Sequence, residues 1–439
     1  MGKVYLDWKT AYDFIEDAFV GYGVPREDAK ICTDVLLESD KRGIESHGCN
    51  RFKPIYIDRI VDGIQNPITN YEIIKETETT AVVDGHDGMG QVIGYKSMKL
   101  AIEKAKKYGM GMVVVRNSCH YGIAGYYATM ATKEGCIGIT GTNARPSVAP
   151  TFGVEGMFGT NPLTIGIPTD EKFDFILDCA SSITQNGKIE YYERIGEDVH
   201  PGTIAGLDGE PVTGDAGVAL KKIRSGEAAL TTLGGIGEAL GGYKGFGYAL
   251  AVELLSASLQ DGNYGKDLNG KDANGKKVPY HLGHFFIAID TNHFLGEDLC
   301  RKKSGDIIRK IRESKKLLIY GHSDPYGILP FVKLTNYNDK KFMEDNPYIY
   351  IIDKDGIREY EVFSSYIETK DFDYVNLESF SGLTYKEHLD KLRKKSFVKH
   401  DIELNDDSKV LILQTCSFDE RVSAKTKFQI VVAKEVDNN

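Results

Sequence analysis

The sequence predicts an α/β domain followed by a smaller, mostly-β domain, with the boundary near residue 314. Upstream of this boundary, short apolar runs typical of strands alternate with stretches of helical spacing, which is the pattern of an α/β fold. Downstream, strand-like runs separated by turn signals dominate the sequence. The chain has 439 residues, long enough for each part to bury a core of its own. We therefore expect two domains, residues 1–313 and residues 314–439.

The elements of the first domain are expected from hydrophobic spacing and from helix start and stop signals. Apolar side chains recur at helical spacing over 9–22, and Pro25 opens a second helix that ends near Gly43. Further helices are expected over 95–108, 122–134 and 244–259. Strands are expected over 111–115, 136–140, 163–168, 173–178 and 284–290. The segment 261–277, rich in Gly, Asn, Asp and Lys, is expected to be a polar, mobile excursion.

The second domain follows a charged helix expected over 304–316. Its strands are expected over 317–320, 348–352, 358–364, 410–415 and 428–433, and its one helix over 385–394. This pattern predicts a mostly-β domain that is short for a closed barrel.

Composition and charge argue against several classes of partner. The net charge of −10 argues against a nucleic-acid partner, because phosphate binding needs a basic face. No apolar run reaches the roughly 18 residues of a membrane span, and the N-terminus lacks the pattern of a signal peptide or lipid anchor. Seven cysteines lie scattered without a CxxC pair, which favours reduced thiols in a cytoplasmic protein and indicates no metal-ligand set.

The first candidate functional group is Ser46-His47-Gly48 with Arg51. An imidazole titrates near neutral pH and can exchange a proton with a carbonyl oxygen, while a guanidinium one turn away can hold a carboxylate in two parallel bonds. The alternative is that Ser46 caps a surface helix and that its neighbours are incidental.

Further candidates follow strand ends and glycine-rich turns. His120 lies between an apolar strand and a helix, where α/β sites usually form. The turn at Asn161 offers side-chain donors, and the strand that reaches Asp178 ends in small residues that allow close ligand approach. A glycine-rich run before Lys244 opens a helix, as in many anion sites. Each segment also fits a purely structural cap or turn, and no strand–GxGxxG–helix pattern supports a Rossmann fold.

Taken in order, these segments resemble the malate/L-lactate dehydrogenase family, which also includes sulfolactate dehydrogenases and diketogulonate reductases. The resemblance runs over about residues 3–313 and rests on residues 38–48, 120–122, 142–144, 159–162, 177–178, 244–245 and 283–286. It implies a non-Rossmann α/β domain, usually a homodimer, that interconverts a small 2-hydroxy acid and a 2-oxo acid with NAD or NADP.

By this resemblance, His47 is the proton donor and acceptor, and Arg51 contacts the substrate carboxylate. His120 and Asn161 are implied as pocket residues. The implied dinucleotide contacts are Asp178, Cys179, Ala180, Ser181, Ser182, Ile183, Thr184 and Lys244. Two features depart from the family: Tyr243 stands where a histidine is common, and the family's last segment, with its Pro-Gly-Glu-like turn near the cofactor, has no counterpart.

The second domain places Cys416 at the end of one apolar strand and His322 after another. A thiolate with a histidine and an arginine is a known nucleophilic arrangement, although a buried, inert cysteine is the commoner case. Residues 318–322, 346–350, 360–364, 411–416 and 431–434 resemble the C-terminal half of a class B sortase, a cysteine transpeptidase that joins sorting-signal peptides to the cell wall. The resemblance implies Cys416 as the nucleophile, His322 as its partner and Arg421 as the third member.

Three functions therefore remain open at the level of sequence. The first is an NAD(P)-dependent 2-hydroxy-acid oxidoreductase with a partial sortase-like β part. The second is a sortase-type transpeptidase that acts on a sorting-signal peptide, and the third is a non-functional fusion of two truncated proteins. The first leads, because the dehydrogenase resemblance is nearly complete and the sortase resemblance covers about half of that family's pattern.

Overall fold

The computed structural model describes residues 6–312, 316–320, 331–353, 356–369, 374, 383–417, 422–423 and 427–436. The chain divides into two compact units, one up to Asp306 and one from Ile307. The division falls inside α9 (Glu297–Arg312), which begins and ends earlier than the helix expected over 304–316.

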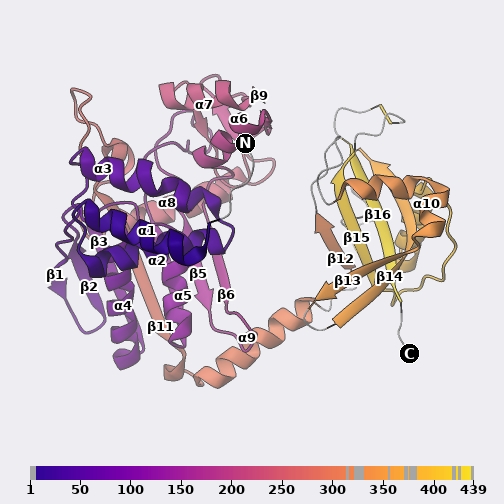
Figure 1. The fold of residues 1–439 in the computed structure, drawn as a ribbon, viewed down its shortest axis with the longest axis horizontal. Helices are drawn as coiled ribbons and strands as arrows, with labels where there is room; N and C mark the ends of the chain where they lie inside the picture. Colours follow the sequence, from indigo (N-terminus) through magenta and orange to yellow (C-terminus); the bar gives the residue numbers. More distant parts are fainter. Residues whose placement is uncertain are drawn as a thin grey trace. The chain divides into compact units, whose positions relative to one another are not determined.

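Unit 1 is built around a seven-stranded mixed sheet with the strand order β1-β2-β3-β11-β4-β5-β6 (Figure 1). Its strands are β1 (Glu72–Glu76), β2 (Thr80–Asp84), β3 (Met110–Ser118), β4 (Cys136–Thr142), β5 (Leu163–Ile167), β6 (Phe175–Cys179) and β11 (Leu282–Asp290). β2 and β3 run parallel, and the other neighbouring pairs are antiparallel. The last of these strands in the sequence, β11, thus lies between β3 and β4.

Helices cover both faces of this sheet. The helices around it are α1 (Trp8–Gly21), α2 (Arg26–Lys41), α3 (Asp58–Val61), α4 (Gly90–Tyr108), α5 (Gly125–Lys133) and α8 (Gly242–Ala257). Val113 and Val115 of β3 share a core with α4 and α5, whereas Val114 between them packs with Val252 of α8. Because successive side chains of a strand point to opposite faces, α4 and α5 lie on one face and α8 on the other.

The N-terminal helices α1 and α2 pack together and add a further layer over α4. Phe19 of α1, Leu36 of α2 and Val92 of α4 belong to one core with Tyr56. Tyr56 comes from a run of short helical turns, η1 (Glu45–His47), η2 (Cys49–Arg51) and η3 (Phe52–Ile57), that leads from α2 to α3. This core therefore fixes the segment that carries the predicted catalytic residues.

A smaller lobe of unit 1 stands apart from the main sheet (Figure 1). It holds α6 (Asn186–Ile195), α7 (Ala216–Ser225) and the short strands β7 (Asp198–Val199), β8 (Ile204–Gly206), β9 (Gly214–Asp215) and β10 (Ala228–Leu230). Ile189 of α6 and Leu220 of α7 share a core with Ala249 of α8. This lobe has no clear signal in the sequence, because its helices are only 10 residues long and its strands have two or three residues.

The segment expected to be a mobile excursion is tied to the rest of unit 1. The Gly265 amide donates to the carboxylate of Glu253 at 2.7 Å. Lys277 contacts the carboxylate of Asp62 at 2.6 Å. Residues 261–277 thus form hydrogen bonds and ion pairs with α8 and with Asp62 after α3, and do not extend freely from the domain as expected.

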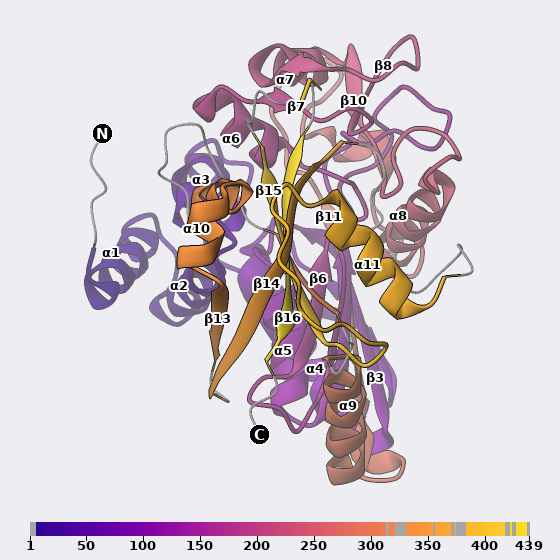
Figure 2. The same ribbon diagram turned by 90° about the vertical axis from the view of Figure 1, so that its right-hand side faces the viewer.

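Unit 2 contains a five-stranded sheet with the order β12-β15-β16-β14-β13. The elements of this unit are β12 (Lys316–Tyr320), η6 (Val332–Asn338), α10 (Lys340–Asp345), β13 (Tyr348–Asp353), β14 (Gly356–Glu368), α11 (Tyr385–Lys395), β15 (Val410–Cys416) and β16 (Phe428–Glu435). β12 runs parallel to β15, and the remaining pairs are antiparallel. Figure 2 shows α10 and α11 on opposite sides of this sheet.

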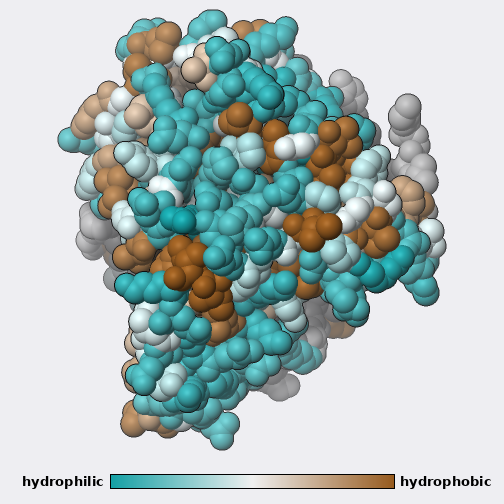
Figure 3. Space-filling view, turned by 90° about the vertical axis from the view of Figure 1, so that its left-hand side faces the viewer, coloured by the Kyte–Doolittle hydropathy of each residue, from teal (hydrophilic) through white to brown (hydrophobic). Residues whose placement is uncertain are grey.

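Within the described ranges, no helix has the length and apolar character that crossing a membrane would require. The face of the molecule shown in Figure 3 is mainly hydrophilic, and its apolar side chains gather in separate groups.

Candidate active site

The turn that carries His47 is held against the end of α2. The His47 amide donates to the carbonyl of Ile44 at 3.0 Å, and the Cys49 amide donates to the Asp40 carboxylate at 2.8 Å. Gly48 leaves room for that carboxylate, since a Cβ at this position would lie 1.8 Å from Asp40 Oδ1. The local sequence therefore needs a glycine directly after His47.

Ser46 and Gln185 orient the ring of His47. Ser46 Oγ lies 2.9 Å from His47 Nδ1 and accepts a hydrogen bond from Gln185 Nε2 at 3.1 Å. Besides the bond from Gln185, the hydroxyl has a second lone pair that can accept from Nδ1–H, which leaves Nε2 of the neutral ring unprotonated and able to take up a proton. Burial, helped by the cation of Arg51, lowers the pKa of His47 from its ordinary value.

His120 lies beside His47, with the two rings stacked at 5.6 Å between centroids. Its Nδ1 accepts a hydrogen bond from the Gly122 amide at 3.2 Å and lies 2.8 Å from the hydroxyl of Tyr56. A backbone amide can only donate, so Nδ1 carries no proton and the neutral ring is protonated on Nε2. Burial and the neighbouring His47 lower the pKa of His120 well below its usual range.

Arg51 is positioned by the same turn. Its Nε donates to the carbonyl of Ser46 at 2.7 Å, while its two terminal nitrogens each lie 3.4 Å from Oε2 of Glu190. Glu190 belongs to α6 in the smaller lobe. Arg51 is the predicted contact of the substrate carboxylate. In this structure its guanidinium is already paired with the carboxylate of Glu190.

A cavity of about 520 Å³ opens beside His47. The implied cofactor segment forms much of its wall, through Asp178, Cys179, Ala180, Ser182, Ile183 and Thr184. Ser181 turns away, since its amide and hydroxyl both donate to the carbonyl of Thr160. Asp178 is also structural, because its carboxylate accepts hydrogen bonds from the Gly125 amide at 2.7 Å and from Thr164 Oγ1 at 3.0 Å.

Four other predicted residues do not line this cavity: Arg51, His120, Asn161 and Lys244. The Asn161 amide is directed to α8, where it donates to the Ala249 carbonyl at 3.1 Å and the Glu253 carboxylate at 2.7 Å. Lys244 is exposed in the first turn of α8, and its Nζ lies 5.8 Å from the ring centroid of Tyr243. The structure brings His47, Arg51, His120 and the strand end at Asp178 together, whereas Asn161 is directed to α8 and Lys244 is exposed on that helix.

Three residues of this arrangement could not be predicted from the sequence. Tyr56, Gln185 and Glu190 contact His120, Ser46 and Arg51 respectively. Each contact joins residues 64 or 139 positions apart in the chain, so no local motif could have revealed it.

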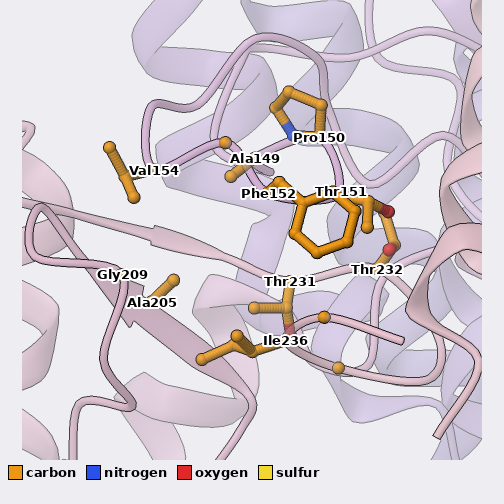
Figure 4. Close-up of a pocket in the computed structure, with 13 residues that line it drawn as sticks. Ala149, Pro150, Thr151, Phe152, Val154, Ala205, Gly209, Thr231, Thr232 and Ile236 are labelled. Atoms are coloured by element: carbon orange, nitrogen blue, oxygen red, sulfur yellow. The ribbon is translucent and has the colours of Figure 1, made fainter. Parts of the chain in front are cut away.

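A second cavity, of about 190 Å³, lies between the turn at 149–154 and residues 231–237 (Figure 4). Phe152 on its rim has a positive φ of 64°, which is unusual for a bulky residue, and its ring is largely exposed beside Thr151. None of the predicted site residues lines this cavity. Among the residues that the structure describes, no group of three or more His, Cys, Asp or Glu could hold a metal ion.

In unit 2, Cys416 is exposed at the end of β15. β12 pairs with β15 so that Tyr320 lies opposite Gln414, and Cys416 itself lies opposite Phe428 of β16. The Ser417 amide donates to the Lys427 carbonyl at 2.9 Å. The predicted partners His322 and Arg421 lie outside the described residues.

Comparison with known proteins identifies the class of unit 1. A family model described as malate/L-lactate dehydrogenase matches residues 6–322, and thus continues past the boundary expected at 313. Malate dehydrogenase from Pyrococcus horikoshii is 44% identical over 305 residues, which is 70% of this chain and 81% of that protein. L-sulfolactate dehydrogenase from Methanocaldococcus jannaschii is 38% identical over 301 residues, 69% of this chain and 82% of that protein.

Solved structures agree with this class. The crystal structure of malate dehydrogenase from Entamoeba histolytica superposes with a TM-score of 0.68 at 44% identity, covering 71% of this chain and 85% of that chain. The fold of unit 1 is therefore that of these dehydrogenases. The chain belongs to the malate/L-lactate dehydrogenase family. Staphylococcus aureus sortase B aligns with 28% of this chain at 27% identity and a TM-score of 0.24, a likeness too small to carry an argument about unit 2.

Proposed function

We propose that this protein interconverts a small 2-hydroxy acid, such as malate or sulfolactate, and the corresponding 2-oxo acid with NAD or NADP, through a site in residues 1–313. The observation that carries the proposal is the pair His47 and His120, stacked at 5.6 Å, with His47 at the wall of the 520 Å³ cavity. A neutral imidazole in this position can take the hydroxyl proton of a 2-hydroxy acid and return it to the carbonyl of a 2-oxo acid.

The cavity fits an elongated cofactor. A recess of about 130 Å³ shares Ile183, Thr184 and Lys188 with the cavity beside His47, so one ligand could extend through both. Small residues, Cys179 and Ala180, line the wall near His47 and let a flat ring approach closely. When bound, NAD or NADP would supply the hydride acceptor or donor. We assign its contacts to residues 178–180 and 182–184, with Lys244 of α8 near its phosphates.

The remaining side chains orient the substrate and the proton. Arg51 would bind the substrate carboxylate, and Ser46 would hold His47 so that Nε2 faces the substrate oxygen. Tyr56 and the Gly122 amide would keep the proton of His120 on Nε2, as a donor to the same oxygen.

Turnover assays test the proposal. NADH and NADPH oxidation is followed with oxaloacetate, sulfopyruvate and pyruvate, and we expect turnover with at least one acid. His47→Asn should lower kcat by about a hundredfold or more, because general acid–base catalysis typically contributes that much. Absence of turnover with every acid and both cofactors would refute the proposal.

A homodimer is the assembly we propose for unit 1. α8 exposes Tyr243, Leu250 and Leu254, with exposed fractions of 51%, 39% and 54%. Large apolar side chains on one helix favour a covered surface in the assembled protein. Light scattering after size-exclusion chromatography should give twice the chain mass of 48.7 kDa, and a monomer would contradict this assembly. We also propose a cytoplasmic location, because dispersed, free cysteines are typical of a reducing compartment.

A second candidate function concerns residues 314–439. The position of Cys416, exposed at the end of β15, favours it. We propose a sortase-like thiol site for a sorting-signal peptide, with Arg421 as the assigned cation. Labelling of Cys416 by a thiol-reactive sorting-signal peptide should be lost in His322→Ala, and equal labelling would favour the alternative of a non-functional fusion.

A further inference from the structure

We propose that Glu190 is an internal competitor for the substrate carboxylate. In this inference, which rests on the proposed function, the Glu190 carboxylate occupies the guanidinium of Arg51 in the empty site and leaves it when a 2-hydroxy or 2-oxo acid binds. Glu190 would then set how tightly the substrate is held, without taking part in the chemical step.

The contact between Arg51 and Glu190 is suited to exchange. Both terminal nitrogens of Arg51 lie 3.4 Å from a single carboxylate oxygen of Glu190. A guanidinium binds a carboxylate best through two parallel, shorter bonds to two oxygens. A substrate carboxylate that offers both oxygens would therefore form the stronger pair and displace Glu190.

Glu190 can remain paired with a second cation after the substrate displaces it from Arg51. Arg224 of α7 lies 3.2 Å from the other carboxylate oxygen, Oε1. An ion that loses one partner and keeps another avoids the cost of an unpaired, partly buried charge. The side chain of Glu190 is 27% exposed, so water can also reach it.

Arg51 stays in place without Glu190. Its Nε is held by the Ser46 carbonyl at 2.7 Å, on the turn that carries His47. The first turn of α6 also packs closely against the guanidinium, since a Cβ at Gly187 would lie 2.4 Å from Arg51 Nη2. Release of Glu190 therefore frees the two terminal nitrogens of Arg51 while the rest of the side chain remains fixed.

The expected effect follows from competition between two carboxylates. A partly exposed ion pair of this kind shifts an equilibrium by about fivefold. Removing the Glu190 charge should lower both the KM for the 2-oxo acid and the dissociation constant of an unreactive analogue by about that factor. The value of kcat should not change, because Glu190 has left Arg51 in both the substrate complex and the transition state.

The experiment compares Glu190→Gln with Glu193→Gln, which removes the same charge from an exposed position on the same helix. KM and kcat are measured with the 2-oxo acid that the unaltered protein turns over. Calorimetry gives the dissociation constant of oxamate, an unreactive 2-oxo-acid analogue, in the presence of NADH or NADPH. Only Glu190→Gln should bind oxamate more tightly, and Arg224→Gln should weaken oxamate binding because Glu190 is then left with Arg51 alone.

The outcomes separate this inference from the proposed function. Turnover with a KM in Glu190→Gln that is unchanged or raised would overturn the competition and leave the oxidoreductase intact. Tighter oxamate binding in Glu190→Gln without turnover by the unaltered protein would support the competition and overturn the proposed reaction. Neither turnover nor oxamate binding would overturn both.

Discussion

We predict that His284 makes the stability of unit 1 sensitive to acid. It is fully buried in β11, with Nδ1 2.7 Å from Thr142 Oγ1 and Nε2 2.8 Å from Ser118 Oγ. The ring stacks on Tyr121 with 4.5 Å between centroids. Burial away from water penalises the charged ring and lowers the pKa of His284 to about 3.

The sign and size of the effect follow from the two states of this histidine. Its pKa is about 6.5 when unfolded and about 3 when folded, so the folded protein favours the neutral ring. This contribution to the free energy of unfolding is complete above pH 6.5 and is lost as the pH falls from 6.5 towards 3. Each pH unit in that window removes about 1.4 kcal/mol, so two units remove about 2–3 kcal/mol, a large part of a typical total of about 5–15 kcal/mol.

Urea denaturation measures this loss. The free energy of unfolding of unit 1 is determined at about pH 6.5 and about pH 4.5 for the unaltered protein and for His284→Gln, whose amide can still bond Ser118 and Thr142. The unaltered protein should lose about 2–3 kcal/mol more than the variant over this interval. The exposed His200 provides the control, since His200→Gln should keep the full pH dependence. Equal losses for His284→Gln and the unaltered protein would refute the reasoning.

Three further predictions concern the proposed reaction. Because burial and Arg51 lower the pKa of His47, kcat/KM for 2-hydroxy-acid oxidation should fall only below pH 6.5, and a pH profile in which the fall begins higher would contradict this. Tyr56→Phe removes a hydroxyl from His120 and should lower kcat/KM by about tenfold, whereas unaltered kinetics would exclude Tyr56 from positioning the ring. Lys244→Gln should weaken binding of NADH or NADPH by about fivefold in a nucleotide-fluorescence titration, and an unchanged dissociation constant would remove Lys244 from the cofactor site.

The longer elements of the fold could be predicted from local signals. Pro25 and the helical spacing of the apolar residues after it predict α2, which begins at Arg26 in the structure. The apolar run before residue 259 predicts α8. β1 could not be found in this way, because all five of its residues are exposed and no alternation of apolar and polar side chains results. The smaller lobe was missed because its core forms only when α6 and α7 pack with Ala249 from a distant part of the chain.

Some residues of the candidate site could likewise be predicted from local signals in the sequence, and others could not. His47 belongs to a short motif, and its place at the cavity follows from the glycine that lets its turn close over Asp40. Ser181 shows the limit of a segment-wide prediction, since it turns inward to Thr160 while its neighbours line the cavity. Glu190 meets Arg51 across 139 positions, and only the three-dimensional arrangement reveals that contact.

The position of β11 has a consequence for how the chain is made. β11 completes the sheet by pairing with both β3 and β4, yet it is synthesised about 140 residues after β4. Until then β3 and β4 each present an unpaired edge, a condition that slows folding and invites association with other chains. A nascent chain that stops before Leu282 would therefore hold two separate halves of a sheet, and we expect such fragments to depend on chaperones or to aggregate.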